Sequence, residues 1–131
     1  MTKEEKQLLL IDLSARLPYE PKARKGGMET NINLTTLDSF YYGDEIILPY
    51  IRPMSSMTVE EGERLEQIAK ETLGDFMFEA EEDGGAIYHM DKWKTLSPAM
   101  FDYLNSIHID YRGLIGRGLA LPAPDGMYNF R

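Results

Sequence analysis

The side chains best suited to acid-base or metal chemistry are two histidines, His89 and His108, because the chain of 131 residues contains no cysteine. The segment His108-Ile109-Asp110 has the residue types of a triad fragment or of a partial ligand set. No nucleophile elbow, HExxH motif or phosphate loop accompanies it, and a zinc site would need carboxylates from distant positions. A histidine near a helix C-terminus more often interacts with the helix dipole. We therefore assign no catalytic residue and no cofactor-binding residue.

A cluster of acidic side chains at residues 79–91 offers oxygen ligands of the kind that a hard cation prefers. Its members are Glu79, Glu81, Glu82, Asp83 and Asp91. Their spacing lacks the alternating carboxylates and the final glutamate of an EF-hand loop. A solvated acidic surface is the favoured interpretation, so we expect no metal site.

The charge of the chain is acidic, with a formal net value of −8, and it is unevenly distributed. Residues 58–91 hold eleven of the 22 acidic side chains, whereas Lys22, Arg24 and Lys25 form a local basic group. Sequence-independent binding of nucleic acid requires lysine and arginine to neutralise phosphates. The composition thus disfavours nucleic acid as a partner and leaves it as an alternative that depends on this basic group.

Tyrosine and arginine are the side chains that point most directly to a protein partner. Both types are favoured at protein interfaces, because each combines a large contact area with a polar group. Two sequence pairs have this composition, Tyr50 with Arg52 and Tyr111 with Arg112, the second beside Asp110. These five residues are the predicted interaction surface. The alternative is that the tyrosines pack at the margin of the core with their hydroxyl groups hydrogen-bonded.

Three helices are predicted from their N-terminal signals. Thr2-Lys3-Glu4-Glu5 and Thr58-Val59-Glu60-Glu61 are capping boxes, and Ser97-Pro98 combines an N-cap with proline at the first helical position. The helices are expected at about residues 3–17, 58–73 and 97–108.

Short strands are predicted in the remaining segments. Residues 20–48 alternate loosely around a tight turn at Lys25-Gly26-Gly27, which predicts a small antiparallel sheet or a partial barrel. A strand is expected from Met28 to Leu37, and a further hairpin is expected at about residues 76–90. The sequence thus predicts a single α+β domain over residues 1–131.

The N-terminal apolar run, residues 8–11, is too short to span a bilayer and is followed by Asp12. It also lacks the small-residue cleavage site of a signal peptide. We expect a soluble, cytoplasmic protein without membrane association.

Three stretches resemble a family of short uncharacterised proteins of Bacteroidales-type gut bacteria, often encoded near phage-like or mobile DNA. The stretches are residues 10–19 (LIDLSARLPY), 49–58 (PYIRPMSSMT) and 101–128 (FDYLNSIHIDYRGLIGRGLALPAPDGMY), 48 of the 131 residues. The sequence departs from the family pattern at Ile107, which replaces a histidine, at Ile109, which replaces phenylalanine, and at Gly116-Arg117, which replaces Glu-Lys. The resemblance implies a small α+β domain with its sheet between the first two helices, and it implies no established activity.

Three functions follow from these observations. The leading hypothesis is a non-enzymatic protein-interaction or accessory protein of phage or mobile-element origin. The alternative is a nucleic-acid-associated accessory protein. The second alternative is a hydrolase or cation-binding enzyme that uses His89 or His108 with nearby carboxylates.

Overall fold

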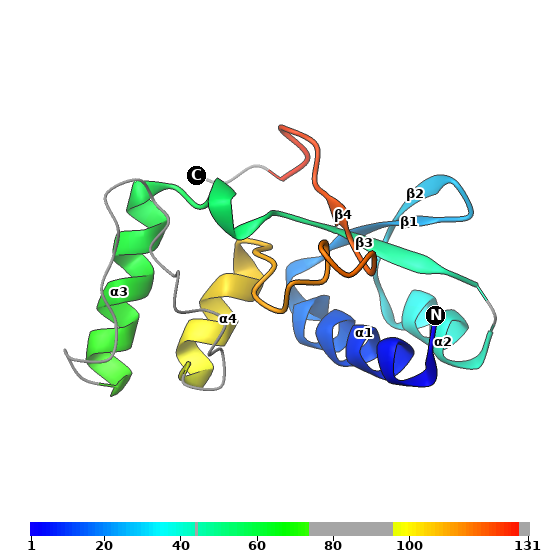
Figure 1. The fold of residues 1–131 in the computed structure, drawn as a ribbon, viewed down its shortest axis with the longest axis horizontal. Coiled ribbons are helices and arrows are strands. Elements are labelled where there is room, and N and C mark those ends of the chain that lie inside the picture. Colours follow the sequence, from blue (N-terminus) through cyan, green and yellow to red (C-terminus); the bar gives the residue numbers. More distant parts are fainter. Residues whose placement is uncertain (44, 74–95, 129–131) are drawn as a thin grey trace. The chain divides into compact units, whose positions relative to one another are not determined.

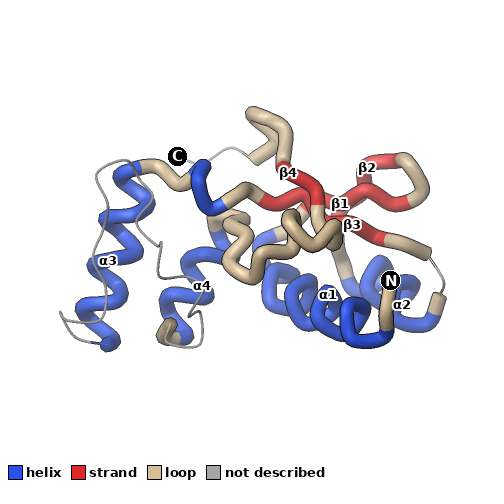
Figure 2. The backbone as a smooth tube through the Cα atoms, viewed as in Figure 1, coloured by secondary structure: helices blue, strands red, loops and turns tan. Residues whose placement is uncertain are grey.

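The computed structural model describes residues 1–43, 45–73 and 96–128 (Figure 1). The chain divides into two compact units, and each has its own hydrophobic core. Unit 1 comprises residues 1–51 together with the segment from residue 113 onward, and unit 2 comprises residues 52–112. Helices and an open mixed sheet confirm the predicted α+β class (Figure 2). The single-domain organisation stays a prediction.

The first helix of unit 1, α1 (Lys3–Arg16), begins at the predicted capping box. The Thr2 hydroxyl accepts from the backbone N–H of Glu5 at 3.0 Å, and the Glu5 carboxylate accepts from the N–H of Thr2 at 2.8 Å. These two bonds satisfy backbone donors that a helix N-terminus leaves open. Pro18 lies in the short 3-10 helix η1 (Leu17–Tyr19) that follows α1.

The sheet of unit 1 has the strand order β2-β1-β3-β4. Its strands are β1 (Lys22–Lys25), β2 (Met28–Asn31), β3 (Ile47–Ile51) and β4 (Leu121–Pro122). β1 is antiparallel to β2 and to β3, and Gly26 and Gly27 form the predicted turn with φ of 59° and 82°. β4 runs parallel to β3, so the sheet is mixed, and it is open at both edges instead of closed into a barrel.

The strand predicted from Met28 to Leu37 is wrong beyond Asn31, because helix α2 (Leu34–Tyr42) begins there. The Asn33 side chain caps α2 by accepting from the N–H of Thr36 at 2.9 Å. Ile32 and Leu37 flank this cap and both pack in the core of unit 1, which is the arrangement of a hydrophobic staple. These local interactions favour a helix over a longer strand.

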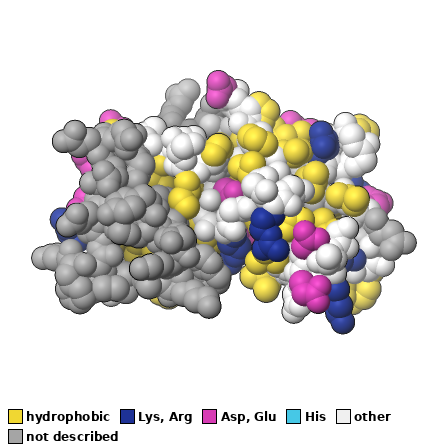
Figure 3. Space-filling view, viewed as in Figure 1, with side chains coloured by type: hydrophobic (Ala, Val, Ile, Leu, Met, Phe, Trp, Pro, Cys, Tyr) yellow, Lys and Arg dark blue, Asp and Glu magenta, His cyan; other side chains and the backbone are white. Residues whose placement is uncertain are grey.

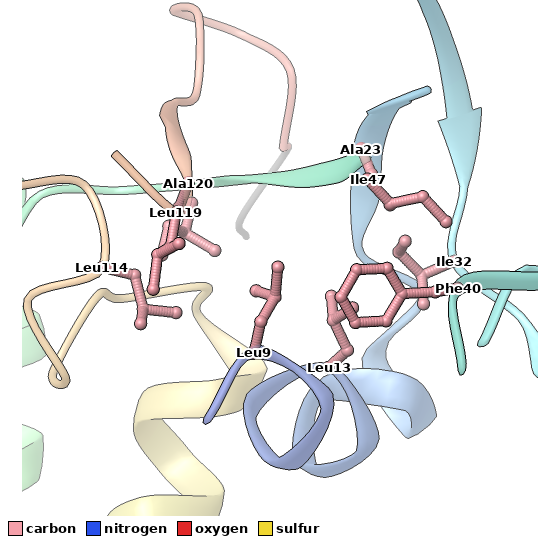
Figure 4. Packing of buried hydrophobic residues seen from close by; sticks show 10 residues of the cluster. Leu9, Leu13, Ala23, Ile32, Phe40, Ile47, Leu114, Leu119 and Ala120 are labelled. Carbon is pink, nitrogen blue, oxygen red and sulfur yellow. The ribbon is translucent and has the colours of Figure 1, made fainter. Parts of the chain in front are cut away.

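Helices α1 and α2 cover one face of the sheet, and the core of unit 1 lies between them and the sheet (Figure 1). Side chains of α1 and α2 point toward those of the strands and of the C-terminal segment (Figure 4). The fully or nearly fully buried members are Leu9, Leu13, Ala23, Ile32, Phe40, Ile47, Ile51, Leu114, Leu119 and Ala120.

Unit 2 contains the two other predicted helices, α3 (Val59–Leu73) and α4 (Pro98–Ser106), and the 3-10 helix η2 (Met54–Ser56). The Thr58 capping box and the Ser97 cap are both present. The buried side chains of this core are Met57, Leu65, Ile68, Ala69, Met100, Leu104, Ile107, Ile109 and Tyr111. The hairpin predicted at residues 76–90 lies outside the described residues.

Within the described ranges, none of the helices combines the length and the apolar character that crossing a bilayer requires.

Candidate functional site

Arg52, a member of the predicted interaction surface, is bound within unit 2. Its guanidinium donates to both carboxylate oxygens of Glu61 at 2.8 Å, and also to the Ser56 carbonyl at 2.8 Å and the Ile107 carbonyl at 3.2 Å. The Arg52 and Glu61 side chains are only 14% and 13% exposed. Arg52 thus connects η2, the start of α3 and the end of α4, and its donors are used inside the unit.

Asp110 and Tyr111, two further members of the predicted interaction surface, are buried, with 6% and 2% exposed. The Tyr111 hydroxyl donates to the Asn105 side-chain oxygen at 2.9 Å. The centroid of the Tyr111 ring lies 5.2 Å from that of the Phe101 ring. The Arg112 guanidinium lies over the Tyr111 ring and donates to its hydroxyl at 3.0 Å. This tyrosine therefore packs in the core with its hydroxyl group bonded, which was the alternative interpretation.

The Tyr50 carbonyl takes part in a contact between the sheet and the C-terminal segment. The Tyr128 hydroxyl donates to this carbonyl at 2.7 Å and accepts from the backbone N–H of Lys22 at 2.9 Å. Burial raises the pKa of Tyr128, so its hydroxyl keeps the proton that this donation requires. Lys22 and Tyr50 lie one step beyond the Ala23–Pro49 pair, so the hydroxyl bridges β1 and β3 where their direct pairing ends.

Of the two histidines, His108 lies among the described residues. His108 is 5% exposed and has φ of 60°, a left-handed conformation, at the turn after α4. Its carbonyl accepts from the Arg52 N–H at 2.7 Å. His89 and the acidic segment 79–91 lie outside the described residues. Elsewhere, no group of three histidine or acidic side chains is arranged to hold a metal ion.

The basic group at β1 is partly neutralised by acidic neighbours. Lys22 lies 3.8 Å from the carboxylate of Glu29, and Lys25 lies 3.2 Å from that of Glu45. Arg24 is exposed on the sheet face opposite to that of buried Ala23. These ion pairs reduce the positive potential that nucleic-acid binding would need.

The exposed apolar surface of unit 1 includes a part that the sequence did not predict. Leu34, Tyr41 and Tyr42 of α2 are 74%, 55% and 79% exposed. Leu34 and Tyr41 are seven residues apart and therefore share one helix face. The centroids of the Tyr41 and Tyr42 rings lie 4.7 Å apart. We call Leu34, Tyr41 and Tyr42 the α2 patch.

A groove of about 330 Å³ lies beside the α2 patch, and both α1 and α2 contribute to it. Its lining residues are Lys3, Lys6, Gln7, Leu10 and Tyr41. The Lys6 ammonium is fixed there, since it donates to the Gly43 carbonyl at 3.2 Å and lies 5.5 Å from the centre of the Phe40 ring. The groove therefore combines apolar walls with two positive charges.

Comparisons with protein-family models, with curated proteins and with solved structures gave no match to this chain. Function is therefore inferred from the geometry of the two units.

The α2 patch was missed because helix α2 was missed. The threonine-rich stretch at residues 30–36 has strand propensity, and it concealed the helix start. The signal that identifies α2 is Asn33 as an N-cap with Ile32 and Leu37 as its staple.

Proposed function

We propose that the protein is a non-enzymatic interaction protein that contacts its partner through the α2 patch. The observation that supports this proposal is the exposure of Leu34, Tyr41 and Tyr42 on one short helix. Apolar side chains that gather on a surface often mark a protein interaction site, and tyrosine is among the residues that contribute most to binding energy. The patch therefore replaces the buried Asp110 and Tyr111 as the centre of the predicted surface.

Most of the exposed large apolar side chains that the structure describes lie in unit 1. Among the described residues, the most exposed large apolar side chains are Met1, Ile11, Met28, Leu34, Tyr41, Tyr42, Ile46 and Val59. Seven of these eight lie in unit 1, and the eighth, Val59, lies in the described part of unit 2. Over unit 1, the space-filling view shows hydrophobic side chains between scattered charges of both signs (Figure 3).

The two units also differ in net charge, and unit 1 is again the one better suited to an interface. Unit 1 contains eight basic and nine acidic residues, a net charge of −1, whereas unit 2 contains six and thirteen, a net charge of −7. Charged residues are depleted at the centres of protein interfaces. A nearly neutral unit with exposed apolar groups suits such an interface better than the acidic unit does. The resemblance to proteins near mobile DNA would make the protein an accessory factor of such an element.

The test is an affinity capture with the full chain as bait. In the patch variant, Leu34, Tyr41 and Tyr42 are all replaced by serine, and Val59→Ser is the matched control, because Val59 is an exposed apolar residue of unit 2. We expect a protein that is retained by the wild type and by the control to be lost with the patch variant. Circular dichroism checks that all three baits are folded.

A protein retained equally by all three baits would show that the α2 patch is not the binding surface. Self-association is measured separately by light scattering after size exclusion, because a second copy is also a protein partner. Concentration-dependent dimers that disappear only in the patch variant would identify the partner as the chain itself.

A further inference from the structure

The groove beside the α2 patch differs in charge from most of this chain. Among the described residues, the charged side chains that line it, Lys3 and Lys6, are both basic, whereas the chain as a whole carries a net charge of −8. The nearby acids of α1 point elsewhere. Glu4 and Glu5 follow Lys3 by 100° and 200° around the helix, and the Glu5 carboxylate is bonded to the Thr2 N–H. The groove is therefore a local basic site on a nearly neutral unit.

The two lysines play different parts in this site. Lys6 is held in place by the Gly43 carbonyl and the Phe40 ring, so its charge is positioned before any partner arrives. Lys3 is exposed at the start of α1 and can move to meet a carboxylate. Leu10 and Tyr41 supply the apolar part of the groove. A ligand that fits must thus present an apolar group and negative charge on one side.

We infer that the groove binds an acidic amphipathic helix of a partner protein, with an apolar side chain against Leu10 and Tyr41 and carboxylates at Lys3 and Lys6. This inference rests on the proposed function and specifies the chemistry of the partner. Helices that place an apolar stripe in a groove recur as a mode of recognition. The complementary charge selects among such helices and speeds their encounter, although it adds little affinity by itself.

The test uses two probe peptides of about 18 residues, long enough to form helix in isolation. Both carry leucines at helical spacing, and the flanking residues are glutamates in one and lysines in the other. Binding to the full chain is measured by NMR titration. We expect the acidic peptide to perturb the amides of Lys3, Lys6, Leu10 and Tyr41 in a saturable manner. Its affinity should fall when NaCl rises from about 50 mM to about 500 mM.

Lys3→Glu is the charge variant, and Arg24→Glu is its matched control. Both substitutions change the net charge by the same amount in unit 1, but Arg24 lies on the sheet face opposite to buried Ala23. Glutamate near a helix N-terminus is favourable, so Lys3→Glu should leave the fold intact. We expect Lys3→Glu to lower the affinity for the acidic peptide about fivefold, and we expect Arg24→Glu to leave that affinity unchanged.

Three outcomes would overturn the inference: equal binding of both peptides, no binding of the acidic one, or equal effects of the two substitutions. Octanoate is titrated in parallel, and saturable binding of octanoate without the acidic peptide would reassign the groove to a small amphiphilic anion. A partner captured through the α2 patch, together with no binding of the acidic peptide, would remove only the inference and retain the proposed function. If no partner is captured through the α2 patch and the acidic peptide does not bind, both the proposed function and this inference are wrong.

Discussion

Two charged side chains of α1, Asp12 and Arg16, lie in the interior of unit 1, with 0% of either side chain exposed. The Arg16 guanidinium donates to both carboxylate oxygens of Asp12, at 2.8 Å and 3.2 Å. Burying charges is expensive, and their attraction offsets that cost only when both partners are present. Removal of one partner should therefore destabilise unit 1 more than replacement of both partners by apolar side chains of similar size.

The first prediction concerns this pair. Asp12→Ala leaves a buried guanidinium without its carboxylate and should lower the free energy of unfolding by about 3–5 kcal/mol. The double variant Asp12→Leu/Arg16→Met removes both charges and should recover most of that loss. Urea denaturation followed by circular dichroism measures both effects. A loss below about 1 kcal/mol for Asp12→Ala would mean that water or other protein groups compensate the guanidinium charge.

The second prediction concerns the Tyr128 hydroxyl, which bonds to the Lys22 N–H and the Tyr50 carbonyl. Tyr128→Phe removes both bonds and leaves two backbone groups unsatisfied, which should cost about 1–3 kcal/mol. Hydrogen exchange at the Lys22 amide should accelerate by the corresponding factor. Tyr41→Phe removes an exposed hydroxyl of the same unit and should change neither quantity. Equal exchange rates in Tyr128→Phe and the wild type would contradict a bridging role.

At the scale of elements, the start of α3 depends on one carboxylate. Glu61 accepts from the N–H of Thr58 at 2.9 Å and from the Arg52 guanidinium. Burial alone would raise the pKa of Glu61, but the bonds from Arg52 and Thr58 outweigh burial and lower it below the usual glutamate value. The ionised carboxylate therefore joins the helix cap to Arg52.

The third prediction is the pH dependence that follows from this lowered pKa. A carboxyl whose pKa is lower in the folded state stabilises the fold above its unfolded pKa, and this stabilisation is lost as pH falls through the folded pKa. The free energy of unfolding should thus fall as pH drops below the ordinary glutamate range. Glu61→Gln keeps an oxygen for the Thr58 N–H but carries no charge, so its stability should depend less on pH. Denaturation at pH 7 and pH 3 compares the two proteins, and identical pH slopes would exclude the Glu61 contribution.

Helices whose start signal stands apart from any strand-forming stretch could be predicted from the sequence, whereas α2, whose Asn33 cap lies in a threonine-rich stretch, was not. The caps at Thr2, Thr58 and Ser97 are short-range features, so they predicted α1, α3 and α4. β4 has only two residues and pairs with a strand about 70 positions earlier, which leaves no periodicity to detect. The burial of Tyr111 could not be predicted, because composition does not show burial: a tyrosine suits an interface and a core equally well.

At the scale of the whole molecule, the chain forms two units with separate hydrophobic cores, and unit 2 is inserted between two segments of unit 1. The C-terminal segment returns to unit 1 through β4 and the Tyr128 hydroxyl. Unit 1 therefore needs both ends of the chain, whereas unit 2 is continuous in sequence. Separate cores permit the units to lose structure at different free energies.

The fourth prediction tests that separation. Leu104→Ala in the core of unit 2 and Leu13→Ala in the core of unit 1 each delete a fully buried side chain, at a cost of about 2–5 kcal/mol. Hydrogen exchange of the full chain should show faster exchange mainly in the unit that carries the substitution. Each variant is the control for the other, because they differ in location and not in chemistry. Equal acceleration in both units, whichever leucine is removed, would mean that the chain unfolds as the single domain that its length predicts. In that case the folding of unit 1 would depend on unit 2, and a partner bound at the α2 patch would stabilise both units by the same amount.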